Sequence, residues 1–143
     1  MAGDRYDPYL NHRFQVEIEG VIVGGFSEVS GLSVEIVTEE LREGGENTFL
    51  HRLPRGARYP NLLLRRGITD SELLWKWCDE TVHGKVARKR ASILLLDDEG
   101  REQWRWNVRN ALPVRWSGPG LQATGHGVAF ESLELSHEGI QKG

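Results

Sequence analysis

Short runs in which apolar and polar residues alternate, separated by glycines, dominate this chain. In the clearest run, Phe14, Val16 and Ile18 alternate with polar neighbours, so a strand over these residues has one buried face and one wet face. The 143 residues include 17 glycines and five prolines, and the glycines fall between such runs without forming a repeat. This distribution is typical of turns between the strands of a β-rich domain.

One helix interrupts the strand pattern, and we predict it at about residues 70–83. Thr69 and Glu72 have the spacing of a capping box, in which each side chain accepts a hydrogen bond from the other residue's amide. Apolar residues then recur at helical spacing, and Gly84 is expected to end the helix. About eight short strands and one flanking helix predict a mainly β domain, either a small antiparallel barrel or two packed sheets. Within it, residues 113–116 are predicted to form a short separate edge piece.

Length and composition favour one domain over residues 1–143, which begins with an irregular arm at residues 1–11. With 38% apolar residues, a chain of this size can bury enough surface to fold without disulfides or metals. The net charge of −3 argues against a uniformly basic nucleic-acid binder. The apolar runs are short and the first residues are polar, so we expect no membrane insertion and no signal peptide, with synthesis and assembly in the cytoplasm.

Residues 33–53 predict an extended β-hairpin that turns at residues 44–47. It carries too little apolar surface to belong to the central core. We therefore expect a projecting arm whose second face is covered by something else, and a partner chain is a good candidate.

Charge is segregated around this hairpin, with acids concentrated before its turn and arginines after it. The charges either cancel within one molecule when the segments fold together, or an acidic face on one subunit meets a basic face on the next. The sequence leaves both interpretations open. An exposed tryptophan outside the apolar stripe of the helix is a further candidate contact, because tryptophan is enriched at interfaces. The candidate subunit-interface residues are Glu35, Glu39, Glu40, Arg42, Glu43, Asn47, Arg52, Arg55, Arg58 and Trp75.

No arrangement of residues indicates catalysis, so we expect no enzyme, no catalytic residue, no cofactor and no metal. The five histidines lack metal-site spacing, and residues 97–100 lack the alternating acids of a calcium loop. Cys78 lies on the apolar stripe of the helix, where an inert thiol is expected. Trp77, Trp104 and Trp106 are expected to pack in the core.

Six segments occur in a distinctive order: residues 14–20 (FQVEIEG), 25–32 (GFSEVSGL), 42–47 (REGGEN), 53–54 (LP), 64–69 (LRRGIT) and 131–139 (ESLELSHEG). Together they closely resemble the tail tube proteins of contractile phages and of phage-derived extracellular contractile injection systems. No one segment is diagnostic, but their order and spacing make chance a poor explanation. The resemblance covers residues 14–140, almost the whole chain.

The resemblance implies a fold similar to that of the hemolysin-coregulated protein of type VI secretion. It implies hexameric rings that stack into the rigid inner tube of a contractile tail, and a lumen that carries payload through a target envelope. The implied partners are further copies of the chain, a sheath protein, a spike hub or baseplate adaptor, a terminator cap, and cargo protein or phage DNA in the lumen. The implied final location is a phage tail or an extracellular injection particle.

Two other functions are compatible with the sequence. The same family includes the adaptor ring that initiates the tube on the spike hub, which the sequence does not separate from the main tube subunit. A monomeric ligand-binding β-barrel would also account for the strands and tryptophans, and it predicts a monomer with an apolar cavity. A small hydrolase has no supporting residues.

Overall fold

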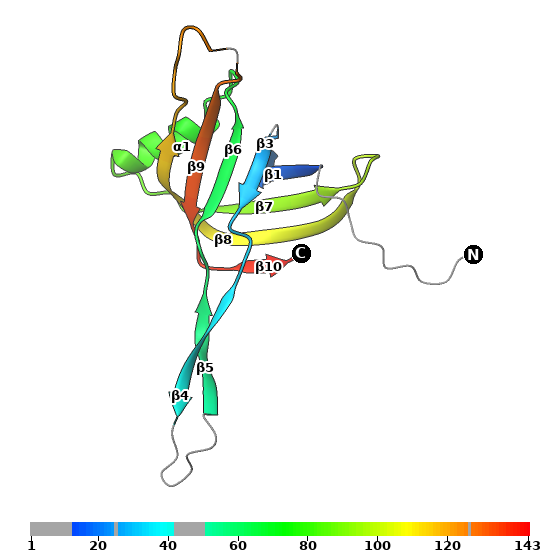
Figure 1. Ribbon diagram of the computed structural model, residues 1–143, viewed down its shortest axis with the longest axis vertical. Helices are drawn as coiled ribbons and strands as arrows, with labels where there is room; N and C mark the ends of the chain where they lie inside the picture. Colours follow the sequence, from blue (N-terminus) through cyan, green and yellow to red (C-terminus); the bar gives the residue numbers. More distant parts are fainter. Residues whose placement is uncertain (1–12, 25, 42–50, 126) are drawn as a thin grey trace, which may run out of the picture.

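The computed structural model describes residues 13–24, 26–41, 51–125 and 127–143 (Figure 1). The predicted N-terminal arm at residues 1–11 lies outside this part of the chain. The described residues form ten strands and one helix, so the mainly β prediction is confirmed. These elements are β1 (Phe14–Ile18), β2 (Val21–Ile22), β3 (Phe26–Ser30), β4 (Glu35–Leu41), β5 (His51–Arg58), β6 (Leu62–Gly67), α1 (Leu73–Val82), β7 (Lys89–Leu96), β8 (Glu102–Ser117), β9 (Phe130–Ser136) and β10 (Ile140–Lys142).

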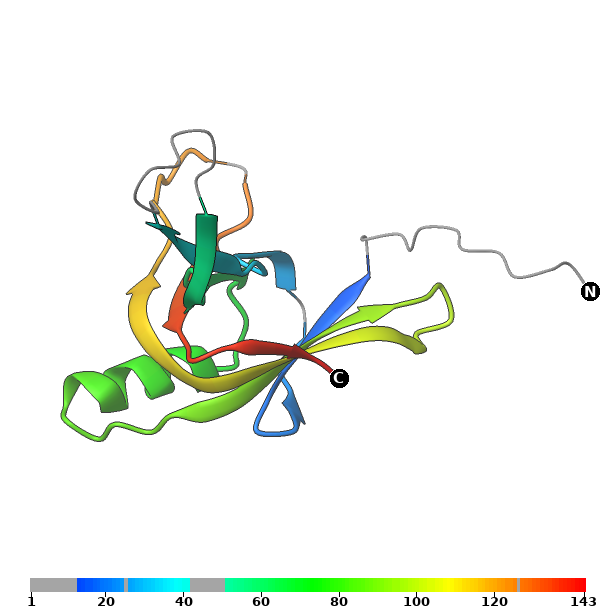
Figure 2. The same ribbon diagram turned by 90° about the horizontal axis from the view of Figure 1, so that it is seen from below.

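Eight of the strands belong to one antiparallel sheet in the order β2-β1-β7-β8-β9-β6-β3, with β10 also paired to β8. The sheet folds into two layers because β8 takes part in both. Residues 102–111 of β8 pair with β7, and residues 112–117 pair with β9. Figure 2 shows β8, in yellow, curving from one layer into the other. In Figure 1 the strands of the two layers cross at a steep angle, an orthogonal packing of sheets.

The prediction of a separate edge piece at residues 113–116 is wrong, because these residues continue β8. The change of layer occurs near Asn110, whose φ of 50° is unusual for a residue other than glycine. A register shift between Pro113 and Arg115 follows in the pairing with β9. Proline and local irregularity suggest a break in the sequence, whereas in the structure they bend one long strand.

The core lies between the two layers and is closed on one side by α1. Strands of both layers contribute fully buried aliphatic residues, and the helix contributes Leu74 and Trp77. The strand order remains open between β2 and β3, so the described strands do not close a barrel. The buried residues of this core are Val16, Ile18, Phe26, Leu62, Leu64, Leu74, Trp77, Ala91, Ile93, Val108, Ala111, Leu133 and Leu135.

Helix α1 is shorter than predicted at both ends, and its predicted capping box is wrong. The N-cap residue is Glu72, which makes no side-chain capping bond, and the Thr69 hydroxyl accepts instead from the amide of Ser71 at 3.2 Å. The C-terminal prediction is confirmed in detail. Gly84 has a φ of 87° and donates to the carbonyl of Thr81, and Lys85 donates to the carbonyl of Glu80. These two bonds form a Schellman motif.

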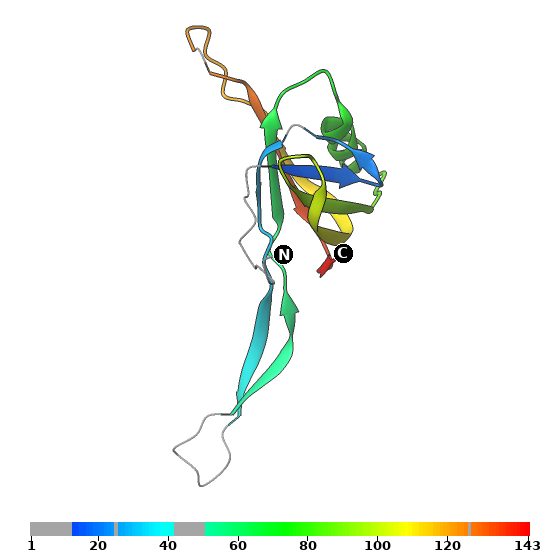
Figure 3. The ribbon, with the colours of Figure 1, turned by 90° about the vertical axis from the view of Figure 1, so that its right-hand side faces the viewer.

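Strands β4 and β5 form a separate two-stranded sheet that projects from the body (Figure 3). The extended hairpin arm is therefore confirmed. Its return strand continues to Arg58, beyond the predicted end at residue 53. The predicted turn at residues 44–47 lies outside the described residues.

Gly31, directly after β3, combines a positive φ with a very close backbone approach. Its φ is 95°, and a Cβ atom placed there would lie 2.2 Å from the carbonyl oxygen of Asn61. Gly100, in the turn between β7 and β8, has a φ of 81° but no atom near such a Cβ. A substitution at Gly31 would therefore cause both backbone strain and a steric clash, whereas a substitution at Gly100 would cause backbone strain alone.

We expect Gly31→Ala to lower the free energy of unfolding by about 3 kcal/mol, because strain and backbone displacement add. Gly100→Ala is the matched control and should cost about 1 kcal/mol, from strain alone. Urea unfolding followed by tryptophan fluorescence measures both changes. Equal losses for the two variants would contradict the close approach at Gly31.

Candidate assembly surfaces

Three ion pairs cross between the two strands of the projecting hairpin. In each pair an acid of β4 meets an arginine of β5. Glu35 and Glu40 lie directly opposite their arginines in the register, whereas Arg55 lies at the register shift and reaches Glu39 diagonally. All six side chains are more than half exposed. The pairs are Glu35–Arg58 at 3.7 Å, Glu39–Arg55 and Glu40–Arg52 at 3.7 Å.

These pairs favour the first interpretation of the segregated charge, in which acids and arginines neutralise each other within one molecule. Exposed ion pairs contribute about 0–1 kcal/mol each, so they balance charge and add little stability. Arg42, Glu43 and Asn47 lie outside the described residues. A contact between subunits through any of these side chains stays a prediction.

The described strands of the hairpin have no buried apolar side chain. Ile36 is 63% exposed, and Val34, Leu41 and Leu53 are also exposed. A two-stranded hairpin is marginally stable in water unless a further strand or layer packs on it. The apolar surface of this arm is therefore unpartnered within the part of the chain that the structure describes.

Trp75 lies on α1 and is 46% exposed, as expected for a residue outside the buried stripe. Its ring meets that of Trp116 in β8 edge to face, with centroids 4.9 Å apart. Its role as an interface anchor stays a prediction. Among the tryptophans expected in the core, Trp77 is buried and Trp106 is partly buried, but Trp104 is exposed and lies beneath the Lys142 ammonium. The prediction for Trp104 is wrong because the end of β8 next to the β7–β8 turn extends beyond the second layer.

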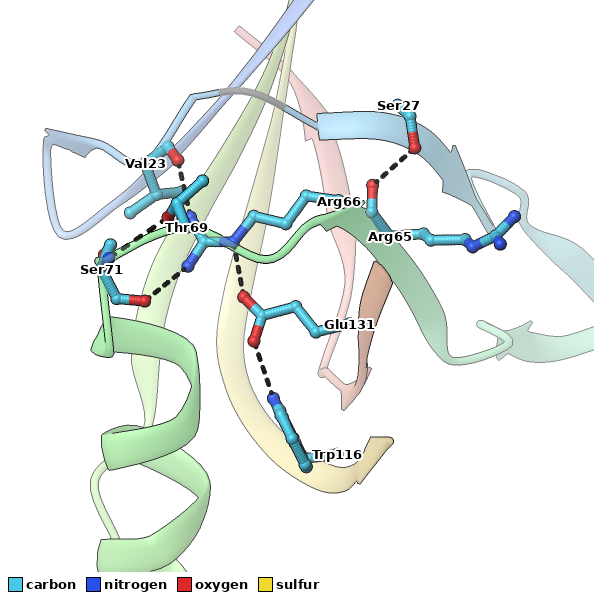
Figure 4. Close-up of polar contacts among 8 residues, drawn as sticks. All are labelled: Val23, Ser27, Arg65, Arg66, Thr69, Ser71, Trp116 and Glu131. Carbon is cyan, nitrogen blue, oxygen red and sulfur yellow. Dashed lines mark hydrogen bonds and ion pairs between the residues drawn. The ribbon is translucent and has the colours of Figure 1, made fainter. Parts of the chain in front are cut away.

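An ion pair between Arg66 and Glu131 is buried in the second layer (Figure 4). Arg66 is 2% exposed and Glu131 is 6% exposed. The Nε of Arg66 donates to Glu131 at 2.6 Å, and the second carboxylate oxygen accepts from Trp116 Nε1 at 3.2 Å. Both carboxylate oxygens of Glu131 therefore accept a hydrogen bond, one from Arg66 and one from Trp116.

The remaining donors of Arg66 reach segments outside the sheet. One guanidinium nitrogen donates to the carbonyl of Val23 at 3.0 Å and the other to the carbonyl of Ser71 at 3.4 Å. The guanidinium carbon also lies 5.4 Å from the centroid of the Phe26 ring. This network joins β6 and β9 to the β2–β3 connection and to the residues just before α1.

The sequence analysis missed this pair, although strand alternation contains the signal. Arg66 shares a face of β6 with Leu62 and Leu64, and Glu131 shares a face of β9 with Leu133 and Leu135. The register places Arg66 directly opposite Glu131. An arginine and a glutamate on otherwise aliphatic strand faces indicate a buried pair.

We expect Glu131→Gln to lower the free energy of unfolding by about 3 kcal/mol, because it leaves the buried Arg66 without a counter-charge. Glu40→Gln, which removes an exposed partner in the hairpin, is the matched control and should cost less than about 1 kcal/mol. Urea unfolding of both variants tests this difference. Similar small losses of unfolding free energy in the two variants would show that the buried pair stabilises the fold no more than an exposed pair does.

No group of three metal-binding side chains occurs among the described residues. Burial, followed by the nearby Asp79 charge, raises the pKa of the Cys78 thiol, which makes the nucleophilic thiolate scarcer at neutral pH. No helix in the described ranges is long and apolar enough to cross a membrane.

The acidic turn between β7 and β8 is organised by Asp97. Its carboxylate accepts from the amides of Glu99 and Arg101 and from the side chains of Arg101 and Gln103, at 2.8–3.0 Å. The amide of Arg101 makes the largest contribution to lowering the pKa of Asp97 below its ordinary value. The carboxylate thus binds donors of the chain itself, which favours a structural turn over a calcium site.

We expect Asp97→Asn to lower the urea midpoint at pH 7. A carboxyl with a lowered folded-state pKa stabilises the fold above its ordinary pKa and loses that contribution as the pH falls through the lowered value. The difference between wild type and variant should therefore shrink on acidification. Urea titrations at several pH values measure it, and a difference independent of pH would contradict the role given to the carboxylate.

An apolar groove of about 380 Å³ lies where the barrel fails to close, between β3 and the strands β1, β7 and β8. It opens to solvent and is not an enclosed cavity of the kind that the ligand-binding alternative predicts. Its apolar lining consists of Phe14, Val29, Leu32, Ile93, Leu95 and Trp106.

The model of the T4-like virus tail tube protein gp19 family matches residues 10–141. The chain belongs to this family. A search of curated proteins gave no match.

Solved structures from contractile injection systems are similar over almost the full length of the chain. A chain of the PVC sheath-tube complex in the extended state is 28% identical, with 95% of this chain and 91% of that chain covered and a TM-score of 0.86. A chain of the anti-feeding prophage tube-terminating cap is 26% identical, with 100% and 95% covered and a TM-score of 0.87. A chain of the anti-feeding prophage baseplate is 26% identical, with 96% and 97% covered and a TM-score of 0.85.

The fold extends to a more distant protein. Hcp1 from Flavobacterium johnsoniae has 15% identity and a TM-score of 0.56, with 91% of this chain and 94% of that chain covered, and this likeness concerns the fold alone. The expected similarity to hemolysin-coregulated proteins is thereby confirmed.

Proposed function

We propose that this chain is a structural subunit of the rigid inner tube of a contractile phage tail or extracellular injection system. The observation that carries the proposal is membership of the tail tube family over residues 10–141. In this function the chain forms hexameric rings that stack into a hollow tube. The role is mechanical, and no bond is made or broken by the chain.

The described surface supports self-assembly on physical grounds. The sheet ends in short strands, β2 and β10, and in β3, which has one strand neighbour. Such edges pair readily with another chain unless they are covered. Together with the uncovered hairpin, they suit a subunit whose neighbours complete its structure.

The partners we propose follow from the similar structures. One of these comes from a sheath-tube complex, one from a baseplate and one from a tube-terminating cap, so we propose a sheath, a baseplate adaptor and a cap as partners. The payload in the lumen, cargo protein or phage DNA, is a further part of the proposal.

A tube-initiating or tube-terminating ring is the second candidate function. The likeness to chains of the baseplate and cap structures favours it, at nearly the same TM-score as the likeness to the sheath-tube complex. A main tube subunit stacks on itself without limit, whereas an adaptor stops after one ring unless its partner is present.

Negative-stain electron microscopy of the purified chain over a range of concentrations tests the proposal. We expect rings with a central hole and, at higher concentration, stacked hollow tubes. Single rings that never stack would identify the adaptor function. A compact monomer at every concentration, confirmed by size-exclusion chromatography, would contradict the tube function and favour the ligand-binding barrel.

A further inference from the structure

A row of polar side chains crosses the layer formed by β1, β7, the first part of β8 and β10. The strand register places one residue of each strand opposite the next in this row. Their sequence neighbours Val16, Ala91 and Val108 are buried in the core, so the row lies on the face of the layer that points away from the core. The members of the row are Glu17, Ser92, Asn107 and Gln141.

An open hollow of about 570 Å³ lies over this row. Its lining includes Arg90, Arg105 and Arg109, together with one carboxylate, that of Glu17. Three positive charges thus meet a single negative charge within the lining. This excess of positive charge favours an anion as the occupant.

Arg105 balances the one carboxylate of the lining. Its guanidinium forms ion pairs with Glu17, at 3.1 Å, and with Glu102 outside the hollow. Arg90 and Arg109, by contrast, form no ion pair with a carboxylate of the described residues. These two arginines are therefore the charged groups of the hollow that can bind an anion from solution.

The Arg109 guanidinium is held in position by the turn between β9 and β10. One of its terminal nitrogens donates to the carbonyl of Glu138 at 3.1 Å. Gly139 leaves room for this group, since a Cβ atom there would lie 2.8 Å from the same nitrogen. A backbone carbonyl fixes the guanidinium without neutralising its charge, so the group is preorganised for a ligand.

The floor of the hollow adds a neutral donor. The hydroxyl of Ser92, a residue that is 7% exposed, donates to the side-chain oxygen of Asn107 at 2.8 Å. The side-chain nitrogen of Asn107 donates to no acceptor of the described residues. It is therefore free to donate to a ligand oxygen.

Acids beside the hollow limit the size of the anion. The Glu19 carboxylate accepts from the backbone amide of Arg90 at 2.8 Å, and the Glu138 carboxylate accepts from the side-chain nitrogen of Asn110 at 2.6 Å. A small dianion can balance the two unpaired arginines of the hollow. A long polyanion would bring further negative charges against these two acids, which is unfavourable.

We propose that this hollow binds a phosphate dianion between the guanidinium groups of Arg90 and Arg109, either as inorganic phosphate or as the terminal phosphate of a small monoester. Such a phosphate carries a charge of about −1.5 to −2 at pH 7, which matches the two arginines. Its oxygens can accept from both guanidinium groups and from Asn107, whereas a carboxylate with one charge balances one arginine alone. The site goes beyond the proposed tube function and does not depend on it.

Isothermal titration calorimetry of the full chain with inorganic phosphate, at pH 7 and low ionic strength, tests the site. We expect saturable binding, and Arg90→Gln and Arg109→Gln should each weaken it about tenfold or more. Arg88→Gln is the matched control and should bind phosphate as wild type does, because Arg88 belongs to the same basic run as Arg90 but lies outside the lining. Equal weakening by Arg88→Gln and Arg90→Gln, or no saturable binding to the wild type, would overturn the proposal.

Folding of the variants is checked by urea unfolding. All three arginines are exposed, so the urea midpoints of the variants should equal that of the wild type. A loss of phosphate binding at an unchanged midpoint supports the site. A loss that occurs only in step with a lowered midpoint would overturn the direct role of the arginines.

Three further probes define the anion. Glycerol phosphate that binds more tightly than inorganic phosphate identifies a monoester as the occupant, and weaker binding identifies inorganic phosphate; both results support the site. Acetate should bind about tenfold more weakly or less, and equal affinity would overturn the choice of a dianion. An oligothymidine that binds more tightly than either phosphate would overturn it in favour of a nucleic acid. Failure of the chain to form rings or tubes would contradict the tube function and leave this site standing.

Discussion

The 16 residues of β8 pair with strands of both layers, and the rest of the fold depends on this shared strand. In its first part β8 lies between β7 and β10, and in its second part it pairs with β9. The positive φ of Asn110 marks where the strand changes direction. One bent strand thereby forms the corner of the core. The sheet is left open between β2 and β3, where none of the described strands completes it.

Alternation predicted much of the fold because it follows directly from which side of a strand is buried. It gave the faces of β1, the β7–β8 hairpin and the stripe of α1 that contains Leu74 and Trp77. It failed where local residue types conflict with longer-range pairing. Pro113 suggested a break that the pairing with β9 overrides, and the spacing of Thr69 and Glu72 suggested a capping box where Arg66 binds the carbonyl of Ser71.

The candidate surfaces were predictable only in part. The charge pattern of the sequence indicated that the hairpin is a candidate contact surface. It did not show whether acids meet arginines within one chain, because that depends on the strand register, which shifts between Val37 and Thr38. The buried pair of Arg66 and Glu131 was predictable from strand faces once β6 and β9 were known to be neighbours. Its partners Val23 and Ser71 were not, because they come from irregular connections.

The account's central claim is that the hairpin is incomplete in the isolated chain and is completed by assembly. Hydrogen exchange of the backbone amides of β4 and β5 tests it most directly, with dissociated protein compared with assembled protein. The account predicts rapid exchange in the dissociated chain, with strong protection only after assembly, while amides of the core strands β7 and β9 are protected in both states. Equal protection of the hairpin in both states would contradict it.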